Sequence, residues 1–131
     1  MLREEKRIQG AENLKWGHEA EQIACDWYLA NGYAIREKNW VCGKNEIDLI
    51  LEKDRVIIFV EVKARKGDNQ APIDAVNAQK RRKMVRGADI YLAMQEHLYS
   101  YRFDIFTVTG TRESYEIDHF PDAFLPKVNV R

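Results

Sequence analysis

The run at residues 56–65, VIIFVEVKAR, begins as an uninterrupted apolar strand and ends in charges. Side chains alternate between the two faces of a strand. One face is wholly apolar and consists of Val56, Ile58, Val60, Val62 and Ala64. The other face passes from apolar to ionic and consists of Ile57, Phe59, Glu61, Lys63 and Arg65. Charges on a core strand are costly unless they are paired or hold a metal, so the charged end needs a specific explanation.

The preceding run, EIDLILE at 46–52, predicts a second strand, joined to the first by a tight turn at residues 53–55. Alternation divides it into an apolar face, Ile47, Leu49 and Leu51, and an opposite face, Glu46, Asp48 and Ile50. Pairing the two apolar faces brings acids of both strands together. A two-residue turn at Asp54-Arg55 sets Asp48 directly across from Glu61, whereas a register shifted by two sets Glu46 there.

In either register, two or three carboxylates meet at one end of a sheet face. Like charges opposite each other destabilise a strand pair, and Lys63 supplies only one positive charge. A hard divalent cation would supply the rest, since Mg²⁺ typically uses one or two carboxylates together with substrate phosphates. Lys63 could orient an attacking water or stabilise charge on a phosphate. The alternative is a surface ion-pair lattice on a solvated sheet face, made by Glu46, Asp48, Glu61, Lys63 and Arg65.

The whole chain of 131 residues reads as one domain, with short tails at 1–12 and 126–131 that need not be ordered. The expected elements are a helix at 11–31, strands at 33–41, 46–52 and 56–65, a helix at 73–97, a strand at 101–110, a short edge strand at 114–120 and a last helical turn from 121. The order α-β-β-β-α-β-β predicts the α/β class, with a mixed sheet flanked by helices.

Composition narrows the range of partners. Twenty-one basic residues balance twenty-one acidic ones, so any nucleic acid must be held by a local patch and not by a global field. The apolar runs are too short to span a bilayer, and neither a signal peptide nor a membrane partner is expected. The two cysteines, Cys25 and Cys42, form no C-x-x-C motif, which is typical of a reduced, cytoplasmic protein.

The spacing of Asp48, Glu61 and Lys63 resembles the core motif of the PD-(D/E)XK nucleases. The fuller pattern is similar to the YraN family of bacterial endonuclease-like proteins, related to archaeal Holliday junction resolvases. It comprises NEIDLI, VIIFVEVKAR, AVNAQKRRK and RFDIFTV, and the likeness runs from about Gly17 to Val108. The resemblance implies a restriction-endonuclease-like core across a single nuclease-like domain.

The resemblance also implies roles for individual residues. It implies a phosphodiester hydrolase dependent on Mg²⁺ or Mn²⁺, with Asp48 and Glu61 as metal ligands and Lys63 positioning the water. The family's first helix carries a Glu that corresponds to Glu21, which would complete the metal site. Glu46 would be a further ligand or an outer acid. Asn45 stands where the family usually has Gly, and we expect it to keep a left-handed turn.

Basic residues near the second helix are candidates for the nucleic-acid interface. The predicted contacts are Arg65, Lys66, Lys80, Arg81 and Lys83, and the polar loop at 66–72 could close on the nucleic acid. Consecutive basic residues wrap most of a helical turn, so a solvated basic face is the alternative. By default, Arg102 and Asp104 of the RFD motif are a structural pair.

The leading hypothesis from the sequence is a structure-selective endonuclease that cuts branched DNA. A two-fold homodimer would match the two symmetric cuts that a junction offers. The first alternative is a non-catalytic nucleic-acid-binding module. The second is a protein-interaction domain that binds through an exposed hairpin edge and Trp40.

Overall fold

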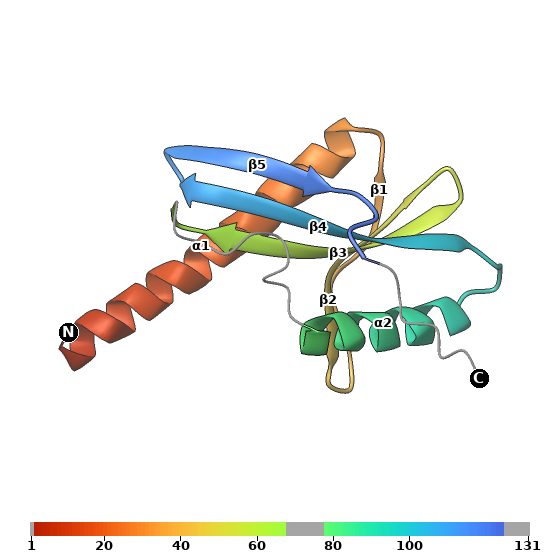
Figure 1. The fold of residues 1–131 in the computed structure, drawn as a ribbon, viewed down its shortest axis with the longest axis horizontal. Coiled ribbons are helices and arrows are strands. Elements are labelled where there is room, and N and C mark those ends of the chain that lie inside the picture. The colour runs from red at the N-terminus through yellow and green to blue at the C-terminus, as the bar shows by residue number, and fades with distance from the viewer. Residues whose placement is uncertain (1, 68–77, 125–131) are drawn as a thin grey trace.

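The computed structural model describes residues 2–67 and 78–124. Its elements are α1 (Arg3–Ala30), β1 (Ala34–Cys42), β2 (Asn45–Lys53), β3 (Val56–Arg65), α2 (Ala78–Ala93), β4 (Ser100–Thr111) and β5 (Ser114–Phe120). The five strands form one sheet in the order β1-β2-β3-β4-β5 (Figure 1). β3 and β4 run parallel, while the other neighbouring pairs are antiparallel. The predicted α/β class, mixed sheet and element order are therefore confirmed.

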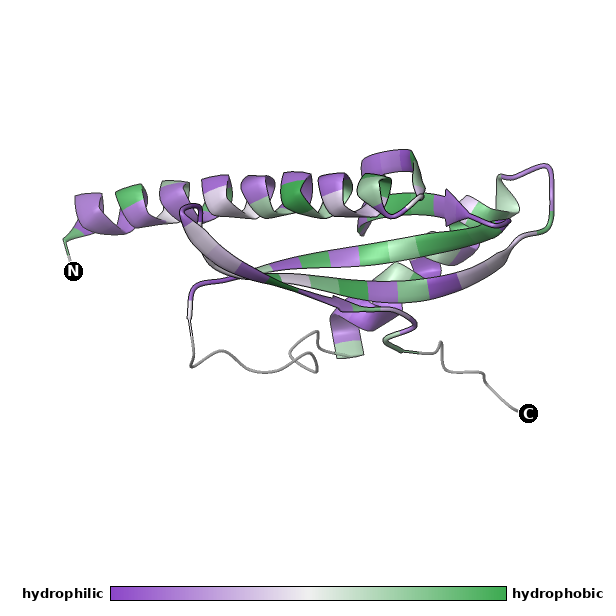
Figure 2. Ribbon diagram, turned by 90° about the horizontal axis from the view of Figure 1, so that it is seen from above, coloured by the Kyte–Doolittle hydropathy of each residue, from purple (hydrophilic) through white to green (hydrophobic). Residues whose placement is uncertain are grey.

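The two helices cover opposite faces of the sheet, as Figure 2 shows. Each face of β3 packs as its alternation predicts. The apolar face lies in the core beneath α1, with Trp16, Ala20, Ala24, Cys25 and Tyr28 of that helix. Ile57 and Phe59 of the other face lie in the core beneath α2, with Met84, Ala88 and Tyr91. A parallel β3–β4 pair needs a crossover connection, and α2 supplies it.

A two-residue turn sets the register of the β2–β3 hairpin. Asp54 and Arg55 both have positive φ, 52° and 66°, as a two-residue turn matched to strand twist requires. The paired residues run from Lys53 opposite Val56 to Leu49 opposite Val60. Of the two registers that the sequence allows, this is the one that brings Asp48, and not Glu46, to the level of Glu61.

The alternation predicted for β2 fails at its N-terminal end. Leu49 and Leu51 pack in the core beneath α1, but Ile47 lies beneath α2 together with Ile50. The pairing of β2 with β3 ends at Leu49, and the β1–β2 hairpin runs past α2 (Figure 1). Gly87 permits this approach, since a Cβ there would lie 3.1 Å from Ile47 Cδ1. A period of two holds only while a strand stays with its neighbour in the sheet.

The turn of the β1–β2 hairpin also differs from expectation. The left-handed position falls on Gly43, with φ 61°, and Asn45 is not among the residues of positive φ. Asn45 pairs with Cys42 as the first residue of β2. The expectation of a left-handed Asn45 is therefore wrong, because the two-residue turn lies one step earlier in the chain.

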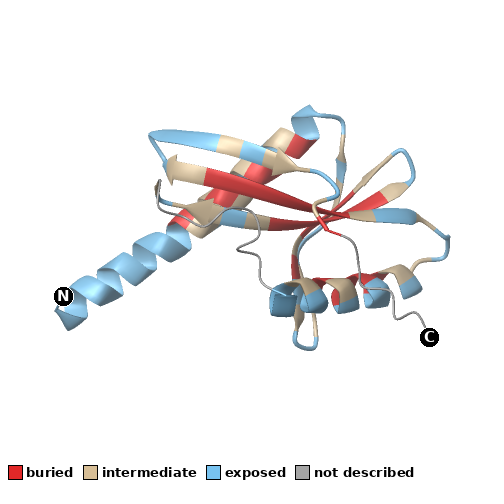
Figure 3. Cartoon of the chain, viewed as in Figure 1, coloured by how far each residue is buried: buried red, intermediate tan, exposed pale blue. Residues whose placement is uncertain are grey.

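Both helices differ in extent from the sequence prediction. α1 begins at Arg3, eight residues before the expected start, and its N-terminal part extends, exposed, beyond the sheet (Figure 3). α2 ends at Ala93, four residues before the expected end. Neither described helix combines the length and apolarity needed to cross a membrane. Residues 121–124 form a turn without a helix, while 68–77 and 126–131 lie outside the described residues.

A buried carboxylate on β4 ties the α1 side of the molecule together. Asp104 is fully buried, and its oxygens accept hydrogen bonds from Tyr28 Oη (3.0 Å), Arg102 Nε (2.9 Å) and the Asp122 N–H (3.0 Å). His119 Nε2 lies 2.9 Å away. Burial raises the pKa of Asp104, but the hydrogen bonds outweigh it and hold the pKa below its ordinary value. Arg102 and Asp104 thus form the structural pair that the sequence predicts.

We expect Asp104 to make the fold sensitive to acid. Because its pKa is lower in the folded protein, the unfolded chain takes up the proton first as pH falls. The stabilisation is therefore complete at neutral pH and is lost below a pH of about 4. Asp104→Asn should lower the free energy of unfolding by about 3 kcal/mol at pH 7, and the difference from wild type should shrink towards pH 3. Urea denaturation between pH 3 and 7 measures this, with exposed Asp118→Asn as control; a difference that is constant with pH would contradict it.

Candidate functional site

Two acids meet where β2 and β3 separate. Beyond the Leu49–Val60 pair the strands no longer pair, and the Val62 N–H donates instead to Asp48 Oδ2 at 2.9 Å. Glu61, the neighbouring residue on β3, has a side chain that is only 2% exposed. The charge of the Asp48 carboxylate raises the pKa of Glu61, so the two carboxyl groups act on each other. We call these two residues the acid pair.

Burial and charge strongly perturb Glu61. Burial, followed by the charge of Asp48, raises the pKa of Glu61 to about 8, even though Lys80 acts in the opposite direction. The Lys80 ammonium of α2 forms an ion pair with Glu61 Oε1. A carboxyl group in this state either holds a proton at neutral pH or requires a cation beside it. In the described structure, that cation is Lys80.

Glu21 and Glu46 approach the acid pair from different elements. Glu21 lies on α1, and burial raises its pKa. A hydrogen bond with Asn39 of β1 lowers that pKa, and the charges of Asp48 and Glu46 raise it further. Glu46 is exposed near the tip of the β1–β2 hairpin. No motif singles out Asn39 in the sequence, although its φ of 49° suits an asparagine.

Lys63 follows Glu61 on the same face of β3. Its side chain is exposed, and it stands opposite Thr107 in the parallel pairing with β4. The ion pair that the described structure shows at Glu61 is made by Lys80 and not by Lys63. The structure therefore brings Asp48, Glu61 and Glu21 into one electrostatic neighbourhood, with Lys63 at its exposed border.

A lysine-lined cleft of about 290 Å³ adjoins the acid pair. It lies between the β1–β2 turn and the start of α2, and its lining residues are Lys44, Glu46, Gln79, Lys80 and Lys83. Lys80 links the cleft to the acid pair, because the same side chain contacts Glu61. Lys44 was not among the predicted basic residues, although its place in the turn beside Glu46 is a usable signal. We call this the lysine cleft.

Two of the other predicted basic residues have structural surroundings. The Arg81 guanidinium lies over the Phe124 ring, 5.4 Å from its centroid, and Arg81 Nε is buried without a hydrogen-bond partner among the described residues. Arg65 is half-buried at the end of β3, where its carbonyl oxygen accepts a hydrogen bond from Trp16 Nε1 at 3.5 Å. Neither residue lines the lysine cleft.

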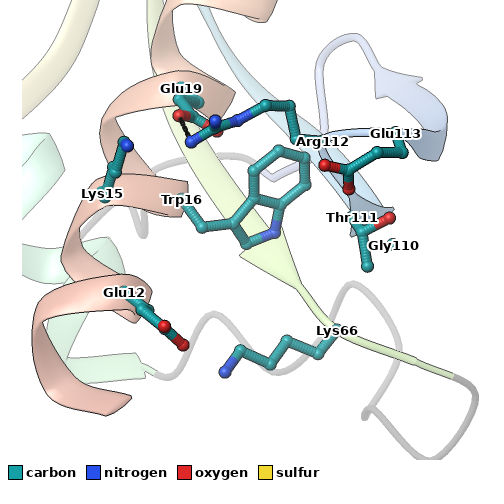
Figure 4. A pocket seen from close by; sticks show the side chains of 9 residues that line it. All are labelled: Glu12, Lys15, Trp16, Glu19, Lys66, Gly110, Thr111, Arg112 and Glu113. Atoms are coloured by element: carbon teal, nitrogen blue, oxygen red, sulfur yellow. Dashed lines mark hydrogen bonds and ion pairs between the residues drawn. The ribbon is translucent and has the colours of Figure 1, made fainter. Parts of the chain in front are cut away.

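Lys66 lies in a different hollow, shown in Figure 4. This hollow has a volume of about 660 Å³ and lies between α1 and the β4–β5 hairpin. Lys66 faces it from one side, while an ion pair between Arg112 and Glu19 closes the other (Figure 4). The basic residues predicted to form one interface are thus divided among separate places.

The donor set at the acid pair consists of oxygens. Within residues 2–67 and 78–124, no three His, Cys, Asp or Glu side chains gather as a metal-binding group. Two carboxyl groups, Asp48 and Glu61, influence each other here, and the Lys80 ammonium is already paired with Glu61. Two carboxylates suit a Mg²⁺ ion whose other ligands are water and phosphate, whereas structural zinc sites need four ligands, usually from Cys and His.

Comparison with known sequences identifies the family. The profile described as "Uncharacterised protein family UPF0102" matches residues 20–108, about two thirds of the chain. The chain belongs to the UPF0102 family. This confirms the family resemblance, and the matched region includes Glu21, both residues of the acid pair, Lys63 and Lys80.

Relatives in this family are similar over nearly their whole length. The UPF0102 protein of Phocaeicola vulgatus is 37% identical, over 90% of this chain and 98% of the relative. The UPF0102 protein of Myxococcus xanthus is 34% identical, over 91% and 96%. UPF0102 protein CPE1705 of Clostridium perfringens is 35% identical, over 86% and 95%. The similarity to these relatives therefore extends over at least 86% of this chain, and the profile match at 20–108 contains the candidate site.

We expect Glu61 to destabilise this UPF0102 chain as pH rises. Its pKa rises from 4.5 to about 8 on folding, so the folded protein binds the extra proton between these values. Wild-type stability should therefore decline from pH 5 to 8, and Glu61→Gln should not show that decline. The variant should gain about 2–4 kcal/mol relative to wild type over this range.

The measurement is urea denaturation in EDTA at unit steps of pH. Glu116→Gln, at an exposed position on β5, is the matched control and should follow the wild type. Parallel curves for wild type and Glu61→Gln would show that Glu61 does not titrate in this range.

Proposed function

We propose that this chain is a metal-dependent nuclease that hydrolyses phosphodiester bonds of branched DNA. The supporting observation is the acid pair at the opening of the sheet, beside a cleft lined by lysines. A buried carboxyl group with a pKa raised to about 8 costs folding energy, and such costs are typical of functional sites. Metal-dependent phosphodiester hydrolysis needs carboxylates that bind a metal ion and, next to them, positively charged side chains that bind the phosphate.

Asp48 and Glu61 are the residues that would hold the cation, with Glu21 supporting them. A bound Mg²⁺ or Mn²⁺ supplies Lewis acidity and lowers the pKa of a bound water. The chain's own residues supply the orientation. The Val62 N–H holds the Asp48 carboxylate from the backbone, and Asn39 holds Glu21. Lys63 extends from the face of Glu61 into solvent, where it would orient the water and balance phosphate charge.

The lysine cleft is the proposed entry for the DNA backbone. Lys44 stands on the β1–β2 turn and Lys83 on α2, so both walls carry positive charge. Such contacts recognise phosphates and therefore the shape of the DNA, not its sequence. A balanced net charge is compatible with this, because binding needs only the local patch. Selection of branched DNA and two-fold assembly are what the family resemblance adds to the proposal.

One of the two features behind the protein-interaction alternative, Trp40, has a structural role. Trp40, expected on an exposed edge, is half-buried and packs edge-on against Tyr91, with ring centroids 5.4 Å apart. Trp40 contributes to the core beneath α2 instead. The non-catalytic nucleic-acid-binding module remains as an outcome of the experiment below.

The deciding experiment incubates the purified chain with a four-way DNA junction and a linear duplex, in Mg²⁺, Mn²⁺ or EDTA. We expect cleavage of the junction with either metal and a loss of at least about 100-fold in Asp48→Asn and Lys63→Met. Exposed Asp118→Asn is the control and should cleave as wild type does. Cleavage retained by both site variants would refute the site, and metal-independent junction binding without cleavage would favour the binding module.

The lysine cleft makes a separate prediction about salt. Each phosphate contact removed should reduce the slope of log K against log salt by about 1. Lys44→Met and Lys83→Met should each do so, measured by fluorescence anisotropy on the junction. Lys66→Met, in the hollow beside α1, should leave the slope unchanged. An equal loss in all three variants would mean that the DNA does not enter through the lysine cleft.

A further inference from the structure

Lys80 contacts Glu61 of the acid pair and also lines the lysine cleft. We infer that Lys80 is an exchangeable counterion, which neutralises Glu61 in the metal-free protein and moves to a DNA phosphate when a divalent cation binds. This inference rests on the proposed function, because it requires the cation site at Asp48 and Glu61. Under this inference the site has two functional lysines, Lys63 on β3 and Lys80 on α2.

The position of Lys80 permits the exchange. Its ammonium forms an ion pair with Glu61, whose side chain is 2% exposed, yet the Lys80 side chain itself is 50% exposed. One end of the contact is therefore in the protein interior and the other in the lysine cleft. A lysine is a compact charge on a flexible four-carbon stem, so its ammonium can turn without moving the helix. An arginine held in a rigid fork would lack this freedom.

The charges around Lys80 keep it cationic. Burial lowers the pKa of Lys80, but the charge of Glu61 and its hydrogen bond outweigh this, and Asp48 and Glu46 add to the effect. The net pKa of Lys80 lies above its ordinary value. The ammonium lies against Glu61 Oε1, an oxygen that would also be needed by a metal ion. A divalent cation on the same carboxylate would repel it.

The lysine cleft gives the displaced ammonium a destination. Lys80 lines this cleft together with Lys44 and Lys83, so a short movement of its stem keeps it among groups that attract phosphate. Cation binding and DNA binding would then support each other through one side chain. Without a bound divalent cation, Lys80 stays paired with Glu61 and adds little to the affinity for DNA.

The first test compares thermal unfolding of the wild type, Lys80→Met and Lys83→Met in EDTA and in 10 mM Mg²⁺, about the scale at which a weak cation site fills. Methionine keeps the length of the stem and removes the charge. At about pH 9, where Glu61 is ionised, Lys80→Met should unfold about 3 °C below wild type in EDTA, because the Glu61 carboxylate has lost its counterion. In Mg²⁺ the difference should close, because the cation replaces the ammonium in both proteins. Lys83→Met should match wild type in both conditions.

The outcomes separate this inference from the proposed function. A deficit of Lys80→Met that is equal in EDTA and Mg²⁺, or absent in EDTA, overturns the exchange while leaving the nuclease proposal intact. No stabilisation of the wild type by Mg²⁺ overturns the cation site, and the exchange with it.

The second test measures binding to a DNA junction in EDTA and in Ca²⁺, another hard cation with oxygen ligands. Lys80→Met should bind as wild type does in EDTA and about 3- to 10-fold more weakly in Ca²⁺, because its phosphate contact forms only after displacement. Lys83→Met should bind more weakly in both conditions. Equal weakening of Lys80→Met in both conditions identifies Lys80 as a permanent phosphate contact and overturns the exchange.

Discussion

The hydrogen bond from the Val62 N–H to the Asp48 carboxylate joins the fold to the candidate site. On the N-terminal side of Leu49, β2 is no longer paired with β3, so the Val62 N–H has no backbone partner on β2. An unpaired buried N–H is costly, and the Asp48 side chain removes that cost. The same bond fixes the carboxylate beside Glu61. The bend that lets the hairpin reach α2 and the acid pair are therefore one structural feature.

Two buried carboxylates show how differently one sheet can treat the same chemistry. Asp104 has Arg102, Tyr28 and a backbone N–H around it, so its pKa falls and its charge supports the fold. Glu61 faces another acid and one lysine, so its pKa rises to about 8 and its charge weighs against the fold. Enough donors turn a buried acid into a structural element. Too few donors leave it ready to take a cation, at the expense of stability.

A balanced net charge conceals a local separation of charge. The lysine cleft and the acid pair are adjacent, and Lys80 lines the cleft while it contacts Glu61 of the pair. Through it, the occupancy of one site would influence the other. The remaining predicted basic residues serve elsewhere, as Arg81 over Phe124 and Lys66 in the hollow beside α1 show. A run of consecutive basic residues therefore overestimates the nucleic-acid interface, because a helix points successive side chains in different directions.

The sequence alone determined the order of elements, the two faces of β3, and the convergence of β2 acids on Glu61. These follow from alternation and turn length, which are local properties of the chain. The observed register decided that Asp48 and not Glu46 lies at the level of Glu61. Only the tertiary structure decided that Ile47 crosses to the α2 side, that the charge of Asp48 reaches Glu21, and that Lys80 contacts Glu61. Those contacts join residues on different elements, and they depend on where β2 leaves the sheet and how closely α2 approaches at Gly87. No local period carries that information.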